Sequence, residues 1–94
     1  MDITLDTLTH EVRRGERLIN LTSKEYLLLE LLMRHPEQVL SREMIAEHMW
    51  NIDANNLSNV IDVYIRYLRR KLCEFGEPDV ISTMRGFGYQ LKEP

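Results

Sequence analysis

Residues 57–73 restrict the folds open to this chain more than any other segment. Their apolar side chains recur at steps of four, three and four residues, which is the spacing of one face of an α-helix. The members of this stripe are Ile61, Ile65, Leu68 and Leu72. At about 100° per residue, they lie within roughly 60° of one another. We therefore predict a helix from 57 to 73 or 74 with one face in a core, and Gly76 and Pro78 after its end.

The other sides of this helix carry more aromatic and basic residues than a core requires. One side is mixed and consists of Val60, Val63, Tyr64, Tyr67 and Lys71. The remaining side carries Arg66, Arg69 and Arg70 together with Asp62. Semi-apolar surface beside cations suits a helix in a DNA groove, where base edges lie next to phosphates. A solvated basic helix face is the alternative for such a charge cluster.

Two further helices are predicted upstream. Thr22 and Glu25 have the spacing of a capping box, an apolar stripe follows them, and Pro36 ends that helix. Ser41 is the expected N-cap of the next helix, which continues at helical spacing to about Trp50. The polar residues after Trp50 predict a loop, so the helices on either side of it must lie close together.

Short strands are expected at both ends of the chain. Residues 2–21 alternate loosely between apolar and polar, with a turn at 14–16, as in antiparallel strands with one wet face. Residues 80–83 and 88–91 predict a hairpin whose turn at 85–87 contains Gly86. The expected fold class is therefore α+β, with an N-terminal antiparallel sheet, three helices and a C-terminal hairpin.

Length, cysteine content and charge limit the class of protein. The 94 residues fit one domain over 1–94, and a single cysteine, Cys73, excludes an internal disulfide and favours a reducing cytoplasm. No signal peptide or membrane span is expected. The net charge of −3 argues mildly against nucleic acid, but it is unevenly placed. Residues 1–56 hold six basic and ten acidic residues (−4), and residues 57–94 hold six and five (+1).

No pattern typical of catalysis is present. The histidines lie in different predicted elements, and the chain lacks a glycine-rich phosphate loop, an HExxH motif and a paired Cys-x-x-Cys. Cys73 and His48 are residue types that bind metals, but two ligands at a spacing not typical of a metal site are weak evidence for one. We therefore expect neither an enzyme nor a cofactor or metal site.

Four segments, in this order and spacing, resemble the winged helix-turn-helix DNA-binding domain of OmpR/PhoB-type response regulators. They are residues 21–26, residues 39–43 with Met49 and Trp50, residues 59–71, and residues 81–89. The resemblance covers essentially the whole chain. It implies a recognition helix over about 57–73 in the major groove and a wing over about 80–91 in the minor groove.

The resemblance also implies roles for individual residues. It places Val60, Val63, Tyr64 and Tyr67 towards base edges, with the valines near thymine methyl groups. Phosphate contacts are expected from Asn59, Arg66, Arg69, Arg70, Thr83, Tyr89 and Trp50. Core packing is the alternative for Trp50 and Tyr89, and packing on the domain is the alternative for Tyr64 and Tyr67. An ion pair or a solvated charge is the alternative for Arg69 and Arg70. Arg85, near the wing tip, is expected to enter a narrow minor groove.

The family context supplies the expected partners. Such domains follow a receiver domain that a sensor histidine kinase phosphorylates, and they bind direct-repeat half-sites as head-to-tail pairs. No receiver pattern is present, so we expect an output domain that begins at an added Met1. Contact with RNA polymerase is expected from the loop before the recognition helix: Asn51, Ile52, Asp53, Ala54, Asn55 and Asn56.

One departure from the family pattern keeps a second function open. Tyr67 stands where arginine often reads a guanine in the family, so a bidentate guanine contact from that position is lost. Together with the acidic total charge, this slightly favours a winged-helix protein-interaction module that no longer binds DNA. Arg66, Arg69 and Arg85 argue against that alternative, because a module for protein alone does not need cations on both helix and wing.

Overall fold

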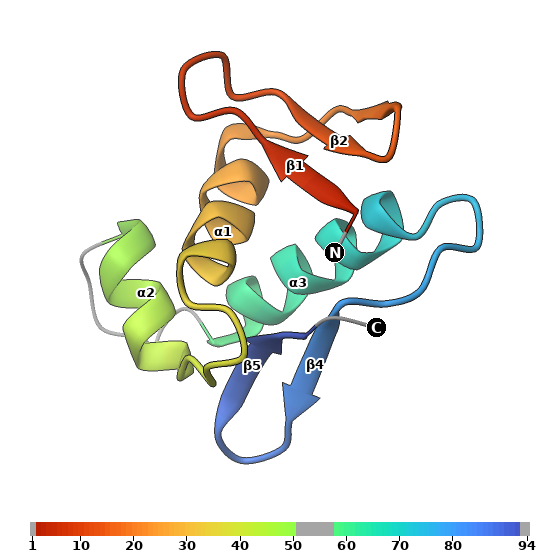
Figure 1. The fold of residues 1–94 in the computed structure, drawn as a ribbon. Coiled ribbons are helices and arrows are strands. Elements are labelled where there is room, and N and C mark those ends of the chain that lie inside the picture. Colours follow the sequence, from red (N-terminus) through yellow and green to blue (C-terminus); the bar gives the residue numbers. More distant parts are fainter. Residues whose placement is uncertain (1, 51–57, 93–94) are drawn as a thin grey trace.

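Two small antiparallel sheets lie at opposite ends of a group of three helices (Figure 1). The computed structural model describes residues 2–50 and 58–92. Its elements are β1 (Ile3–Leu5), β2 (Val12–Arg14), β3 (Arg17–Ile19), α1 (Ser23–Arg34), α2 (Arg42–Trp50), α3 (Ser58–Leu72), β4 (Ile81–Met84) and β5 (Gly88–Leu91). The predicted α+β fold class and the order of its elements are confirmed. The helix expected to reach residue 73 or 74 ends at Leu72, and the first wing strand begins at Ile81.

The N-terminal sheet covers one side of the core with every second side chain. Its strands pair in the order β1-β2-β3, and Gly15 has a φ of 60° in the predicted turn between β2 and β3. Buried side chains on its inner face are Ile3, Val12 and Ile19. The stripe predicted on α3 completes the core opposite them, since all four of its members are buried.

Glu25 joins the start of α1 to the end of α3. It completes the predicted capping box, because its Oε1 accepts from the Thr22 N–H at 2.9 Å and its own N–H donates to the Thr22 hydroxyl. The same Oε1 accepts from Lys71 Nζ at 2.6 Å. Burial by itself would raise the pKa of Glu25, but the bonds from Lys71 and Thr22 outweigh it and lower that pKa below its ordinary value.

Two arginines of the N-terminal sheet cap the C-terminal end of α3. Arg14 is 3% exposed, and its guanidinium donates to the carbonyls of Leu72 at 2.9 Å and Pro78 at 2.6 Å. Arg17 donates to the same Leu72 carbonyl at 3.2 Å. Helix ends leave such carbonyls without intrahelical partners, and cations there also interact favourably with the helix dipole. No pattern within a short segment of the sequence indicates this contact.

The C-terminal hairpin is attached to the segment before α2. Leu40 and Tyr89 exchange two backbone hydrogen bonds, at 2.8 and 2.9 Å, as an isolated antiparallel bridge. Gly88 makes this approach possible, because a Cβ on it would lie 2.0 Å from the Leu40 carbonyl oxygen. The predicted N-cap of α2 is also present, since the Ser41 hydroxyl accepts from the Met44 N–H. Among the described residues, none of the helices combines the length and the apolar character needed to span a bilayer.

Candidate nucleic-acid interface

The face of α3 that points away from the core is largely apolar and open. Val60 is 37% and Tyr67 is 42% exposed, and Val63 and Tyr64 are half-buried between them. These four side chains line one shallow hollow on the surface of the helix. The expectation that they share a face is thus met, with Tyr67 open to solvent and Tyr64 packed in part against the core.

Exposed cations border this face. The guanidinium of Arg70 lies over the ring of Tyr67, 5.7 Å from its centre, so the two side chains form a cation–π pair. Arg66 is exposed, and within residues 2–50 and 58–92 it makes no hydrogen bond or ion pair. Both side chains can therefore reach a charged group outside the domain without breaking an ion pair in the described structure.

Arg69 is held within the domain. Its guanidinium donates to the Ile81 carbonyl at 2.7 Å and to the Thr83 hydroxyl at 2.8 Å, and it pairs with Asp79 at 3.3 Å. The ion pair named as the alternative for Arg69 is therefore present, and it ties α3 to the first strand of the hairpin. Thr83 is exposed, and a hydroxyl that accepts from Arg69 keeps its own proton for an external acceptor.

Tyr89 belongs to the core. It is 4% exposed, and its hydroxyl donates to Asp62 in α3. Burial, and then the bond to Asp62, raise the pKa of Tyr89. Of the two roles left open for this residue, the structure therefore shows packing, and its hydroxyl is already used inside the domain.

Arg42 is a further cation beside α3 that was not among the predicted site residues. It is the first residue of α2, donates to Asp62 at 3.1 Å and lies over the Tyr89 ring, 5.4 Å from its centre. The hydrogen bond to Asp62 raises the pKa of Arg42. A cation in the first turn is unfavourable next to the helix dipole, and the bond to Asp62 offsets this; no signal within α2 pointed to it, because Asp62 lies 20 positions away. Since positions 62, 66 and 69 share a helical face, Arg42 joins Arg66 and Arg69 on the side of α3 next to the hairpin.

The hairpin ends in a tight turn that exposes a third cation. The Phe87 N–H donates to the Met84 carbonyl at 2.8 Å, and Gly86 has a φ of 82°. Arg85 is exposed, and no described residue pairs with it. The predicted position of Arg85 at the tip is thus confirmed, with Met84 and Phe87 exposed beside it.

Other predicted contacts lie outside what the structure describes. Trp50 ends α2 and Asn59 lies in the first turn of α3, but their side chains are not among those described. The loop predicted to contact polymerase, residues 51–56, lies outside the described residues altogether.

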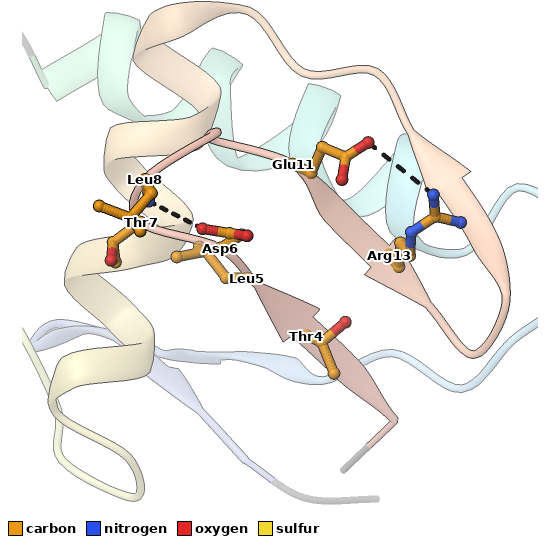
Figure 2. A pocket seen from close by; sticks show the side chains of 7 residues that line it. All are labelled: Thr4, Leu5, Asp6, Thr7, Leu8, Glu11 and Arg13. Carbon is orange, nitrogen blue, oxygen red and sulfur yellow. Dashed lines mark hydrogen bonds and ion pairs between the residues drawn. The ribbon is translucent and has the colours of Figure 1, made fainter.

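A second hollow lies at the N-terminal sheet, and its lining has no arrangement of side chains typical of a catalytic site (Figure 2). Its charged side chains bind to residues close to them in the sequence. Glu11 pairs with Arg13 at 3.8 Å, and the Asp6 carboxylate accepts from the N–H groups of Leu8 and Thr9, which lowers the pKa of Asp6. Within the described ranges there is no group of three or more histidine, cysteine, aspartate or glutamate side chains that could hold a metal ion.

Comparisons with known proteins agree on one family. Residues 15–91 match the family described as "Transcriptional regulatory protein, C terminal". The chain is 50% identical over 93 residues to the response regulator MprA of Mycobacterium sp. (strain KMS), and 49% over 92 residues to MprA of Mycobacterium tuberculosis (strain ATCC 25618 / H37Rv). These alignments include 99% and 98% of this chain but 40% of each relative, so the chain spans less than half the length of those regulators.

Solved structures of the same fold include two bound to DNA. The DNA-binding domain of Klebsiella pneumoniae RstA, in complex with the RstA box, superposes with a TM-score of 0.89 at 26% identity, over 98% of this chain and 92% of that one. The DNA-binding domain of the response regulator AdeR, in complex with an intercistronic region, gives 0.88 at 32% identity, over 100% and 97%.

Proposed function

Because this chain belongs to the OmpR/PhoB-type transcriptional regulatory proteins, as the winged-helix DNA-binding domain of a response regulator, we propose that it binds double-stranded DNA in a sequence-specific way. In this proposal α3 enters the major groove and the β4–β5 hairpin enters the minor groove. The family is one of transcriptional regulators and not a class of enzymes.

One observation carries the proposal. The apolar face of α3 is bordered by the exposed Arg66 and Arg70, while Arg85 stands unpaired among the described residues on a different element. Cations on both elements suit a duplex, whose two grooves are separated by a line of phosphates. The fold shared with RstA and AdeR, whose DNA-binding domains were solved with DNA, supports the same conclusion.

We assign two kinds of DNA contact to these side chains, contacts with base edges and contacts with phosphates. We assign base-edge contacts to Val60, Val63, Tyr64 and Tyr67, with the valines on thymine methyl groups and the tyrosine hydroxyls on base edges or phosphates. Phosphate contacts are assigned to the remaining polar side chains of the interface: Arg42, Trp50, Asn59, Arg66, Arg69, Arg70 and Thr83. Arg42 and Arg69 would do so with whatever donors their internal bonds leave free.

The wider context of the regulator is also part of the proposal. We expect a receiver domain phosphorylated by a sensor histidine kinase to control this domain, and head-to-tail pairs to occupy direct-repeat half-sites. RNA polymerase would be contacted by residues 51–56. A protein that regulates genes in this way in a bacterium works in the cytoplasm, where the chromosome lies.

Salt-dependent DNA binding tests the proposal. A labelled pool of duplexes is titrated with the chain and followed by fluorescence anisotropy at two salt concentrations. We expect affinity to fall steeply as salt rises, because phosphate-bound counterions are released on binding. Arg66→Ala and Arg85→Ala should each weaken binding while the far-ultraviolet circular dichroism spectrum is unchanged. Absence of binding at low salt, from a folded chain, would instead point to a protein partner.

A further inference from the structure

The tip of the hairpin holds apolar surface that the domain leaves in water. The ring of Phe87 is 73% exposed, and Met84, its partner across the turn, is 37% exposed. Between them in the sequence stands Arg85, with no partner among the described residues. Phe87 and Met84 therefore form a small apolar surface at the tip, next to Arg85, that the core does not use.

The charge of the hairpin selects the kind of contact. Residues 80–92 contain no aspartate or glutamate, and the nearest acid before them, Asp79, pairs with Arg69. A tip with one unpaired cation and no acid is complementary to a polyanion and not to a basic protein. Figure 1 also shows this tip on the side of the molecule away from the N-terminal sheet.

We propose, building on the function proposed above, that Phe87 is an apolar minor-groove contact that acts together with Arg85. The walls of that groove are deoxyribose rings, which offer C–H surface between the phosphates. Proteins that bind there combine arginine or lysine with apolar side chains, phenylalanine and methionine among them, that press on the sugars or between base steps. In this arrangement Arg85 supplies the charge, and Phe87 with Met84 supplies surface that leaves water.

The two contributions differ in their response to salt. Neutralising a phosphate or entering the negative potential of the groove releases counterions, so removal of Arg85 lowers the slope of log K against log salt by about 1. Burial of a ring releases no counterions. Removal of Phe87 therefore weakens binding by the same factor at every salt concentration, and this separates an apolar contact from an ionic one.

The test compares two phenylalanines of equal exposure. Phe75, in the segment after α3, is 72% exposed, and its ring lies under the guanidinium of Arg17 in β3, 4.9 Å from it. Phe87→Ala and Phe75→Ala thus remove the same group from water at two places. The probe is a fluorescein-labelled duplex enriched from a random pool by the wild-type chain. Affinity is measured by anisotropy at about four salt concentrations, and log K is plotted against log salt.

The expected result is a roughly 5- to 30-fold loss of affinity for Phe87→Ala, as burial of about half of the ring would give. The salt slope should equal that of the wild type, Phe75→Ala should bind like the wild type, and Phe87→Leu should restore most of the affinity. Unchanged binding by Phe87→Ala would overturn this inference alone. A lower salt slope in Phe87→Ala would also overturn it, because the ring would then act by positioning Arg85. A wild-type chain that binds no duplex would overturn the proposed function itself, and this inference with it.

Discussion

Replacing Gly88 by alanine should break the attachment of the hairpin to the rest of the domain. The added Cβ would lie 2.0 Å from the Leu40 carbonyl oxygen, 2.8 Å from its carbon and 2.9 Å from the Ser41 Cα, all backbone atoms that no rotamer change can move. Ordinary contact at that oxygen needs more than an ångström of additional separation. The strand must therefore withdraw from Leu40, and the two bonds between Leu40 and Tyr89 are lost.

The cost follows from these contacts. Two backbone hydrogen bonds contribute about 0.5–1.5 kcal/mol each. A side chain at the observed φ of 148° adds strain of about 1–2 kcal/mol. With some loss of packing around Leu40 and Tyr89, we expect the free energy of unfolding to fall by about 3–5 kcal/mol, out of about 5–15 kcal/mol for a domain. The melting temperature should fall by roughly 15–30 °C.

Gly86 provides the matched control in the same hairpin. Its φ is 82°, but a Cβ there would meet nothing within 4 Å. Gly86→Ala therefore keeps only the backbone strain, about 1–2 kcal/mol. Urea unfolding followed by circular dichroism gives both numbers, provided that the two variants keep the same dependence on urea. Equal destabilisation of the two variants would refute the steric argument, because strain alone would then explain both.

Three further predictions test the interior and the interface. Arg14→Met should lower the free energy of unfolding by about 3 kcal/mol or more in urea titrations, since the Leu72 and Pro78 carbonyls lose a buried cation, whereas Arg13→Met, at an exposed position, should change it little. Arg85→Ala should weaken specific DNA binding by about 1–3 kcal/mol in anisotropy titrations without lowering the melting temperature, and unchanged affinity would remove Arg85 from the interface. The pKa of Glu25 is lowered by folding, so its contribution to stability is present above the unfolded pKa and is lost as pH falls through the folded one. Urea midpoints of the wild type should therefore drop more steeply between about pH 5 and pH 2 than those of Glu25→Gln, and parallel curves would exclude this role.

Local signals in the sequence were sufficient for the elements. The capping box at Thr22, the N-cap at Ser41 and the stripe on α3 depend on residues within one or two turns of each other, and all three are present. The tip position of Arg85 likewise follows from a turn of adjacent residues. Such features can be predicted because their causes lie within one short segment.

Contacts between distant segments could not be predicted in this way. For Arg69 the sequence left a phosphate contact and an ion pair both open, because its partners Ile81 and Thr83 lie 12 to 14 residues away on a hairpin whose approach depends on the whole core. Arg42 looked like an ordinary first-turn residue until α3 brought Asp62 to it across 20 positions. Periodicity indicates which face a residue occupies, and only the packed fold indicates which polar groups share that face.

The arginines that cap α3 have a consequence for the placement of that helix. The carbonyl of Leu72, the last residue of the helix proposed to read DNA, accepts a hydrogen bond from Arg14. Arg14 lies 58 positions earlier in the chain, on β2 of the N-terminal sheet. The position of the C-terminal end of α3 is thus held by two residues that lie outside the proposed interface. Under the proposed function, a substitution at Arg17 would therefore act on the placement of the whole helix and not on one contact of its outer face.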